Sequence, residues 1–414
     1  MYNPFIFNLP IPKFGKILNG CYNAGPMLAD DSNGATTEDS KMQIVANVSK
    51  ADFFEYLQLL KNNGYTFEQE NRIGDNYFAD FSNYHLAYYN AQKELRLILD
   101  KIKFPFQKFN YKFNGPDNSA LYQYKLIYDK NNVCTETTVN CGMFYIIHLS
   151  DNSLVMIDGG HRLQWNNSEI NELWRFLRKI TDTAETEKIR IAAWFFTHAH
   201  DDHTDGCIKL LDKFKDYILL ERVMFNFPFY PDFKNDYSRT SHEMKKKVSL
   251  YYPEVMQMKL HTGQKINLAD AEFEVMYTHE DAVLAKQPDI FPLENFNCTS
   301  TILRLTLHDK SIIILGDTNV ESENVLKRIS SPTIWKSDAV QVAHHCFNYL
   351  DTLYEWIAAP LALIPNSYYA AHTVENSPKL DGVLRHMPDK TNIYYEGTNT
   401  YGFHATEDKW ELVK

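Results

Sequence analysis

Residues 197–206 read Thr-His-Ala-His-Asp-Asp-His-Thr-Asp-Gly, and they directly follow the apolar run Ile-Arg-Ile-Ala-Ala-Trp-Phe-Phe of residues 189–196. Such a run predicts a buried β-strand, so the histidines stand where that strand ends. Imidazole nitrogens and carboxylate oxygens are the ligands that zinc and related metals take in proteins. Three imidazoles and a carboxylate in so short a stretch therefore predict a loop around metal rather than a solvated polar loop.

The period of a strand divides these ligands into two sets. His198 and His200 are two residues apart, so at a strand end they point to the same side. Asp202 and His203 follow the turn and can face a second ion nearby. We therefore expect one centre with two metal ions, with these four side chains among the ligands.

Three further apolar runs end in residues of the same chemical types. Asp158, Asp317 and the pair of His344 and His345 each stand directly after such a run. With the histidine-rich stretch they resemble, in order, the motifs of the metallo-β-lactamase superfamily, whose signature is His-x-His-x-Asp-His. The resemblance covers about residues 119–414. It implies that Asp158 holds the metal loop as a hydrogen-bond acceptor, that Asp317 bridges both metals, and that one histidine of the pair closes the second metal site.

The chain departs from the family pattern at one ligand. Many members have a histidine between the second and fourth motifs, where this chain has Asn295 or Asn297. We place Asn297 beside the metal ligands; His279 is an alternative third ligand, although a surface histidine at a strand end is the simpler interpretation. The asparagine and the double histidine resemble the subgroup that contains competence-type DNA-uptake proteins and phosphorylcholine esterases. Those members usually continue with Gly-Ser, where this chain has Cys346 and Phe347.

Spacing does not decide which histidine of the pair binds metal. Neighbours on a strand face opposite sides, so one of the two is expected to bind. The family's usual ending aligns with the second, so we favour His345 as the ligand and expect His344 to act on the transition state. The same subgroup often has a histidine near the substrate after the next strand, which here is His372. The candidate catalytic residues are Asp202, His344 and His372.

Two units are expected along the chain. In residues 116–414 strand-like runs alternate with helical stretches, which predicts an αββα sandwich, with two sheets packed face to face and helices outside. Residues 1–115 are expected to form a small α+β accessory domain, in which a helix begins with a capping box at Ser49. We find no constellation of titratable residues there, so binding, dimerisation and substrate gating all stay open. In the larger unit, helices are expected at residues 168–180, 203–214, 241–250, 320–329, 352–358 and 377–387.

The composition limits the partners. The 44% of hydrophobic residues allow a sizeable core, and the formal net charge of −11 argues against extended nucleic-acid binding. Six scattered cysteines without a Cys-x-x-Cys pair fit neither a disulfide framework nor a thiolate zinc site. The chain begins without a basic segment followed by an apolar one, and no apolar stretch approaches the roughly 20 residues that span a bilayer. We expect a cytoplasmic protein with no membrane partner.

These residues favour a hydrolase that uses a metal-bound hydroxide. Two metals bridged by Asp317, two Zn²⁺ with Mn²⁺ or Fe as alternatives, would acidify a shared water that Asp202 can orient. The asparagine and double-histidine variant resembles phosphoesterases, so the expected substrate is a small molecule with a phosphoester or phosphodiester bond. Carboxylic ester, lactone or thioester hydrolysis is the alternative. Two alternatives belong to other classes of protein: a non-catalytic or regulatory metal-binding module, and an iron redox enzyme. The sequence does not indicate the oligomeric state.

Overall fold

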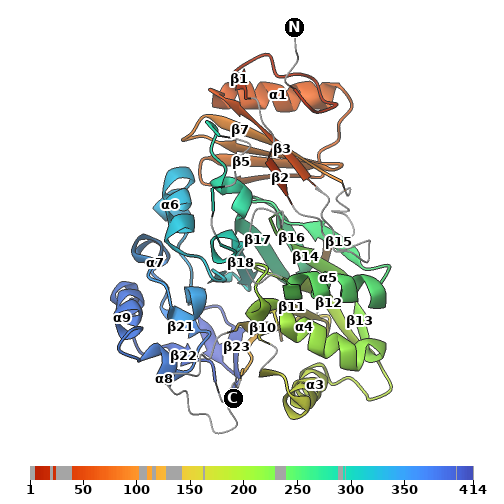
Figure 1. Ribbon diagram of the computed structural model, residues 1–414, viewed down its shortest axis with the longest axis vertical. Helices are drawn as coiled ribbons and strands as arrows, with labels where there is room; N and C mark the ends of the chain where they lie inside the picture. The colour runs from red at the N-terminus through yellow and green to blue at the C-terminus, as the bar shows by residue number, and fades with distance from the viewer. Residues whose placement is uncertain are drawn as a thin grey trace.

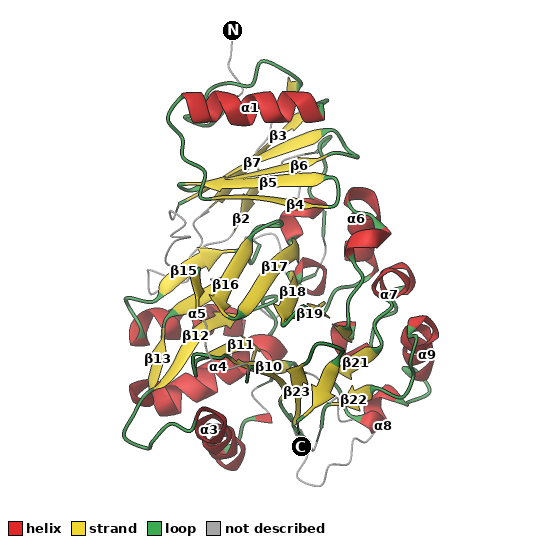
Figure 2. Cartoon of the chain, turned by 180° about the vertical axis from the view of Figure 1, so that it is seen from behind, coloured by secondary structure: helices red, strands yellow, loops and turns green. Residues whose placement is uncertain are grey.

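The computed structural model arranges the chain as two stacked units (Figure 1, Figure 2). The N-terminal unit is a seven-stranded antiparallel sheet with one helix, and the other unit contains two larger sheets. The described residues are 5–18, 22–24, 40–101, 110–113, 118–126, 142–161, 164–228, 239–287, 292–293, 295–397 and 399–413.

An amphipathic helix covers one face of the N-terminal sheet. α1 (Lys50–Asn62) begins at Ser49, whose hydroxyl accepts from the backbone nitrogen of Asp52 at 3.1 Å, while Asp52 Oδ2 accepts from the backbone nitrogen of Ser49 at 2.8 Å. This reciprocal bonding confirms the predicted capping box. The helix buries Phe53 and Leu60 in the core of this unit. In sheet order the strands are β1 (Lys16–Ile17), β3 (Ser40–Ala46), β7 (Glu94–Asp100), β6 (Tyr84–Tyr89), β5 (Asn76–Phe81) and β4 (Gln69–Ile73), with β2 (Tyr22–Ala24) paired to β3.

Two sheets form the centre of the second unit. Their inner faces share one apolar core, which includes Tyr145, Phe195, Phe273 and Leu305. The nine-stranded sheet contains β15 (Met256–Lys259), β14 (Arg222–Phe225), β12 (Ile189–Phe195), β11 (Leu154–Asp158), β10 (Phe144–His148), β9 (Ala120–Gln123), β23 (Tyr401–Ala405) and β24 (Trp410–Leu412), with β13 (Ile218–Leu220) paired to β12. The eight-stranded sheet contains β22 (Ile393–Tyr395), β21 (Leu361–Ile364), β20 (Ala339–Gln341), β19 (Lys310–Ile314), β18 (Ile302–Leu307), β17 (Ala271–Tyr277), β16 (Lys265–Ala269) and β8 (Tyr111–Lys112).

Helices cover both outer faces, as Figure 1 shows. α3 (Asn167–Thr181), α4 (Asp201–Phe214) and α5 (Arg239–Tyr251) pack on the nine-stranded sheet. α6 (Val320–Ile329), α7 (Asp351–Ile357) and α9 (Ser377–His386) pack on the eight-stranded sheet. Each helix that the sequence predicts for this unit is present, with its ends within two residues of the expected ones. The αββα layers and the small α+β unit before them confirm the predicted fold class.

One predicted strand is shorter than expected. β20 ends at Gln341, and the 3-10 helix η7 (Ala343–Cys346) follows, where His344 and His345 have left-handed φ values of 48° and 51°. The prediction that these two histidines are strand neighbours facing opposite sides is therefore wrong. The chain has already left the sheet when it reaches them, and the left-handed turn sets the direction of each ring.

The two units meet through buried polar side chains. His261 lies between two carboxylates: its Nε2 is 2.9 Å from Asp100 Oδ2, and its Nδ1 is 2.6 Å from Glu280 Oε2. Arg96 of β7 donates to the backbone oxygen of Glu280 at 2.6 Å. Glu280 stands in the 3-10 helix η4 (His279–Ala282) of the second unit. We call this cluster the junction; its members are Tyr89, Arg96, Asp100, His261, Glu280 and Asp281.

The division at residue 115 stays a prediction. β8 stands before that residue in the chain, yet it pairs in parallel with β16 of the second unit. Among the described residues, no helix is both long enough and apolar enough to cross a membrane.

Candidate metal centre

The histidine-rich stretch lies where β12 is followed by α4. β12 ends at Phe195, His198 and His200 lie in the connecting turn, and α4 begins at Asp201. Asp201 and Asp202 stand in the first turn of α4, where carboxylates interact favourably with the positive end of the helix dipole. The helix start and the ligand-bearing turn are thus built by the same residues.

Asp158 stabilises the histidine-rich stretch from the neighbouring strand. It ends β11, which runs parallel to β12, and it is fully buried. Its carboxylate accepts from the backbone nitrogen of Thr197 at 2.8 Å and from His203 Nδ1 at 2.7 Å. The second bond makes Nδ1 the protonated nitrogen and turns Nε2 of His203 toward the centre. Burial lowers the pKa of His203, but the carboxylates of Asp317 and Asp158 outweigh it and hold that pKa well above its usual range. The site therefore favours a cation at His203, either a proton or a metal ion.

Asp317 lies between the two sets of ligands. Its backbone nitrogen donates to Ser300 Oγ at 3.0 Å, which fixes the turn after β19. Its Oδ1 is 3.2 Å from His203 Nε2, and its Oδ2 is 3.3 Å from His345 Nε2 and 3.8 Å from His198 Nε2. Burial raises the pKa of Asp317, but the histidines around it hold that pKa well below its usual range. One carboxylate thus faces both sets of histidines in its ionised form.

The unsatisfied atoms of the cluster fit a metal. His203 Nε2, His345 Nε2 and Asp317 Oδ1 are buried and have no hydrogen-bond partner among the described residues, because their mutual contacts lack the geometry of a hydrogen bond. Buried nitrogen and oxygen atoms are nearly always paired, so several unpaired ones in one place point to a ligand that they bind together. Within each of two groups, the potential ligand atoms lie within 4.8 Å of one another. The groups are Asp202, His203, Asp317 and His345, and His198, His200 and Asp317.

His345 and His344 stand differently toward Asp317. His345 Nδ1 is 3.0 Å from the backbone oxygen of Pro365, a contact that turns the opposite nitrogen toward Asp317. His344 Nε2 is 3.8 Å from Asp317 Oδ2 and accepts from Asn297 Nδ2 at 3.1 Å. The structure thus places His345 inside a group of potential ligands and places His344 and Asn297 beside it.

Some side chains of the cluster are partly exposed to solvent. The side chain of His345 is 1% exposed, whereas that of Asp202 is 14% exposed and that of His344 is 25% exposed. Phe347 lies against the rings of both histidines, with centroid distances of 5.7 Å to His344 and 5.9 Å to His345. A substrate can therefore approach past Asp202 and His344, with Phe347 nearby.

Two other histidines lie apart from these ligands. The exposed His372 follows α8 (Tyr368–Ala371); its Nδ1 is 2.7 Å from the backbone oxygen of Tyr368, and its ring stacks on that tyrosine at 3.9 Å. His279 is buried in η4, with Nε2 3.0 Å from Asn226 Oδ1, and burial lowers its pKa to about 4. The interpretation of His279 as a surface histidine is therefore wrong, because its strand ends inside the protein.

Sequence reasoning missed a third group of potential ligands next to the centre. His161 Nε2 lies 3.3 Å from Asp201 Oδ2, and Asp205 completes the group. The Gly-Gly-His sequence that follows Asp158 could have drawn attention to it.

It also missed Glu396, which follows β22 and is only 3% exposed. Burial holds the pKa of this carboxyl well above its usual range, while His345 and His203 oppose that rise. Glu396 stands alone between a tyrosine and a glycine, so no local pattern marks it.

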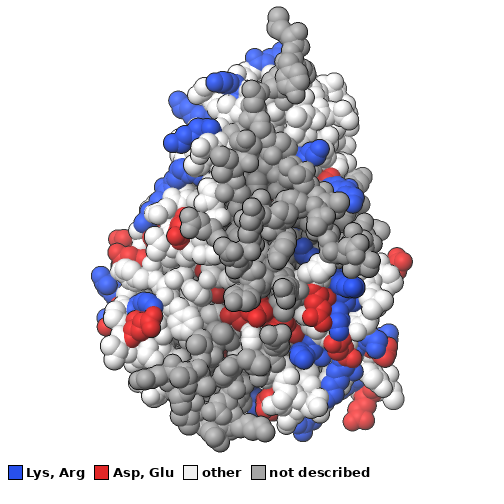
Figure 3. Space-filling model, viewed as in Figure 1, with Lys and Arg blue, Asp and Glu red and all other residues white. Residues whose placement is uncertain are grey.

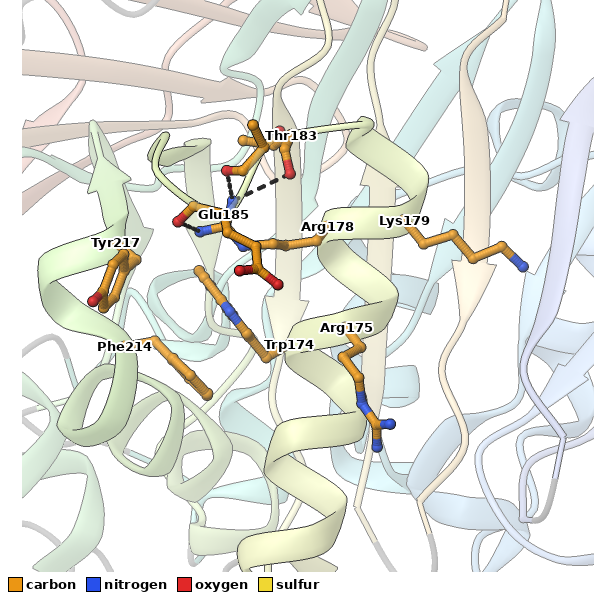
Figure 4. Close-up of a pocket in the computed structure, with 9 residues that line it drawn as sticks. Trp174, Arg175, Arg178, Lys179, Thr183, Glu185, Phe214 and Tyr217 are labelled. Carbon is orange, nitrogen blue, oxygen red and sulfur yellow. Dashed lines mark hydrogen bonds between the residues drawn. The ribbon is translucent and has the colours of Figure 1, made fainter.

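A surface pocket of about 650 Å³ beside α3 contains none of the predicted site residues (Figure 4). Arg178 lies over the ring of Trp174 at 4.7 Å and donates to the backbone oxygens of Thr183 and Glu185, both at 3.2 Å. The cation is thus engaged in holding the loop after α3. The pocket is lined by Trp174, Arg175, Arg178, Lys179, Thr183, Ala184, Glu185, Phe214 and Tyr217.

Charged side chains are mixed on the face drawn in Figure 3. Described Lys and Arg residues lie mostly along its edges, and Asp and Glu residues gather near its middle. The described residues of this face do not form a continuous basic surface of the kind that binds a polyanion.

Comparison with known proteins gives one family. The sequence matches the Metallo-beta-lactamase superfamily over residues 135–352, which is more than half of the chain. The matched stretch contains Asp158, the histidine-rich stretch, Asp317 and both histidines of η7. Among curated proteins none matches.

Several solved structures share part of the architecture. The metallo-beta-lactamase fold protein YhfI from Bacillus subtilis is 8% identical, with a TM-score of 0.39 over 69% of this chain and 100% of its own. Zn²⁺-bound PqqB from Methylobacterium extorquens is 8% identical, with a TM-score of 0.41 over 68% of this chain and 99% of its own. CmlA, a diiron beta-hydroxylase from Streptomyces venezuelae, is 10% identical, with a TM-score of 0.39 over 70% of this chain and 55% of its own. These likenesses are too distant to carry a functional argument. On the family match over residues 135–352, the chain belongs to the metallo-beta-lactamase superfamily.

Proposed function

We propose that this chain is a metal-dependent hydrolase that binds two divalent ions and cleaves a phosphoester or phosphodiester bond. The observation that carries the proposal is that two groups of potential ligand atoms share Asp317. Their mixture of imidazole nitrogens and carboxylate oxygens suits zinc, with manganese or iron as alternatives. When bound, such ions acidify water and polarise the oxygen of the bond to be cleaved.

The residues of the chain supply binding and orientation. Asp317, with Oδ1 near His203 and Oδ2 near His345, would hold both ions at a fixed separation. Asp202 belongs to one ligand group and is also partly exposed to solvent, so its carboxylate can orient the attacking water by accepting a hydrogen bond from it. Asp158 keeps the imidazole of His203 in place through the bond to Nδ1.

His344 and Asn297 support a phosphoester over an acyl substrate. They contact each other at 3.1 Å beside Asp317, and the side chain of His344 is partly exposed to solvent. In phosphoryl transfer the developing charge is spread over several oxygens, so more than one hydrogen-bond donor is useful. When a substrate displaces this mutual contact, the His344 tautomer with a proton on Nε2 and the amide of Asn297 can each donate to a different oxygen of one phosphoryl group.

Metal analysis and a substrate panel test this proposal. The metal content of the purified protein is measured by mass spectrometry, and hydrolysis is followed with bis-p-nitrophenyl phosphate, p-nitrophenyl phosphorylcholine and a p-nitrophenyl carboxylic ester. We expect two zinc or manganese ions per chain and turnover of a phosphoester. Full metal with turnover of the carboxylic ester alone would replace the proposed bond by an acyl bond. The absence of both metal and turnover would favour a binding module.

A further inference from the structure

Three buried side chains beside the metal centre each have a polar oxygen without a hydrogen-bond partner among the described residues. Glu396 Oε1, Tyr145 Oη and Gln123 Oε1 are each enclosed without a hydrogen-bond partner in the part of the chain that the structure describes. Tyr145 and Gln123 are fully buried, and Glu396 is almost so. Native interiors leave few polar atoms unpaired, and ordered water satisfies most that no protein group reaches. Three such atoms in one region therefore indicate a small polar pocket.

The three side chains come together from different strands. Tyr145 of β10 and Gln123 of β9 are paired residues of the antiparallel ladder, so their side chains share a face. Gln123 Nε2 donates to the backbone oxygen of Ile364 at 2.8 Å, and the backbone nitrogen of Glu396 donates to the same oxygen at 2.9 Å. After burial, Glu396 is the main group that raises the pKa of Tyr145, which agrees with a carboxyl close to that hydroxyl.

The pocket adjoins the segment that orients His345. The backbone oxygen of Pro365 is 3.0 Å from His345 Nδ1, and Asn366 Nδ2 donates to the backbone oxygen of His345 at 2.9 Å. Both residues directly follow Ile364, whose own oxygen is held by the pocket. The ring of His345 in turn acts electrostatically on Glu396, so the carboxyl lies within reach of the metal centre.

We infer that Glu396 is a positioning residue: with Tyr145 and Gln123 it encloses a buried pocket that binds water and fixes residues 364–366 against His345. The inference rests on the proposed metal centre, but not on which bond is cleaved. Burial favours the neutral acid form of this carboxyl, which can donate as well as accept a hydrogen bond. Glu396 therefore acts on His345 indirectly, through hydrogen bonds in the pocket and through residues 364–366, rather than by supplying charge.

Titration with Co²⁺, followed by visible absorption, tests this role without any assay of activity. Glu396→Gln keeps the size and the hydrogen-bonding groups of the side chain, whereas Glu396→Leu removes those groups. We expect Glu396→Gln to bind Co²⁺ with the affinity and spectrum of the wild type. Glu396→Leu should lose about tenfold or more in affinity for one of the bound ions, with shifted bands, which is the usual effect of removing support behind a metal ligand. Glu411→Leu changes an exposed glutamate of β24 and serves as the matched control.

Each outcome has a clear consequence. Wild-type Co²⁺ affinity and spectrum in Glu396→Leu would overturn the inference, and so would a Glu396→Gln variant as impaired as Glu396→Leu. If Glu396→Leu does not fold, Tyr145→Phe decides: it removes one hydroxyl, and an unchanged spectrum and affinity would overturn the pocket's role. Failure of the wild-type chain to bind Co²⁺ would instead contradict the proposed metal centre itself.

Discussion

The metal centre and the junction both contain buried histidines and carboxylates, yet the ring nitrogens of their histidines have different surroundings. In the junction, His261 is closed on both sides, because each ring nitrogen faces a carboxylate within 2.9 Å. In the metal centre, His203 and His345 each keep one buried nitrogen that no group in the described part of the chain pairs with. A buried histidine with both ring nitrogens paired stabilises the fold, whereas one with an unpaired nitrogen is available to a ligand. The two clusters should therefore respond differently to substitution.

The largest effect is expected at the shared ligand. Asp317→Ala removes the carboxylate that faces both groups of histidines, so the variant should lose both metals, or at least all activity. Metal content by mass spectrometry and phosphodiester turnover are the measurements. Asp381→Ala, an exposed position on α9, should leave both unchanged. If Asp317→Ala keeps its metal and full activity, Asp317 does not bridge the metals, and the contrast between the two clusters fails.

The second-largest effect is expected on the free energy of unfolding rather than on metal content. Asp100→Ala leaves His261 with Glu280 as its remaining carboxylate, so the variant loses a buried hydrogen bond between charged groups, which typically costs about 1.5–3 kcal/mol in the free energy of unfolding. Urea denaturation measures it, and metal content per folded chain should stay at the wild-type value. Asp75→Ala breaks an exposed pair with Arg72 in the same unit and should cost less than about 1 kcal/mol. A variant Asp100→Ala that is stable but loses metal would show that the junction serves the metal centre.

The pH dependence of stability should report the junction. Burial lowers the pKa of His261, but Glu280 and Asp100 raise it from 6.5 to about 10, so its contribution is complete below 6.5 and is lost as the pH rises through about 10. Burial raises the pKa of Glu280, but His261 brings it from 4.5 down to about 2, so its contribution is complete above 4.5 and is lost as the pH falls through about 2.

Urea midpoints are measured across this range in the presence of a chelator, which removes metal binding. Because the pKa values of His203 and His345 are also raised in the metal centre, the difference between the wild type and His261→Gln isolates the junction. The wild-type chain should lose stability toward both ends, and His261→Gln should flatten the alkaline limb. An alkaline limb that His261→Gln does not alter would mean that other groups govern it.

The difference between the two clusters also explains why the metal ligands and the fold class could be predicted from the sequence. His198, His200, Asp202 and His203 are neighbours in the chain, so spacing alone points to a common ligand, and the strand before them gives their place in the fold. The fold class could be predicted for the same reason, since the alternation of strands and helices repeats locally. The turn at η7 is predicted wrongly, because left-handed backbone has no reliable signature outside glycine.

The junction could not be read from the sequence in this way. Asp100 and His261 are 161 residues apart, and Tyr89 and Asp281 are 192 residues apart. Each looks like an ordinary strand or loop residue in its own stretch, which is why the N-terminal residues show no titratable constellation in sequence. Only the docking of one sheet on the other unit brings their charges together. Glu396 escaped notice for the same reason, because its neighbours in space come from other strands.

A smaller effect is expected beside the ligands, where the contrast can be sharpened within the centre itself. His344→Asn is chosen because asparagine tolerates the left-handed φ of 48° at this position. If His344 stabilises the transition state rather than binding metal, the variant should keep its metal and lose about 10²-fold in turnover number. Loss of metal would show instead that His344 is a ligand. His372→Asn tests the remaining catalytic candidate in the same assay; an unchanged turnover would remove it from the site.

The smallest effect on the free energy of unfolding is expected at the N-terminal cap of α1, which is formed by residues close in sequence and does not belong to either cluster. Ser49→Ala removes the hydroxyl that accepts from the backbone nitrogen of Asp52 and should lower the free energy of unfolding by about 1 kcal/mol, with metal content unchanged. Ser331→Ala is the matched control, since Ser331 precedes a 3-10 helix without any side-chain capping bond. The helix cap can be predicted from the sequence as readily as the metal ligands. Its removal should nevertheless lower the free energy of unfolding less than Asp100→Ala does, although no local sequence pattern predicts the importance of Asp100. A loss at Ser49→Ala as large as at Asp100→Ala would mean that local order in α1, rather than the buried charges, determines the stability of the N-terminal unit.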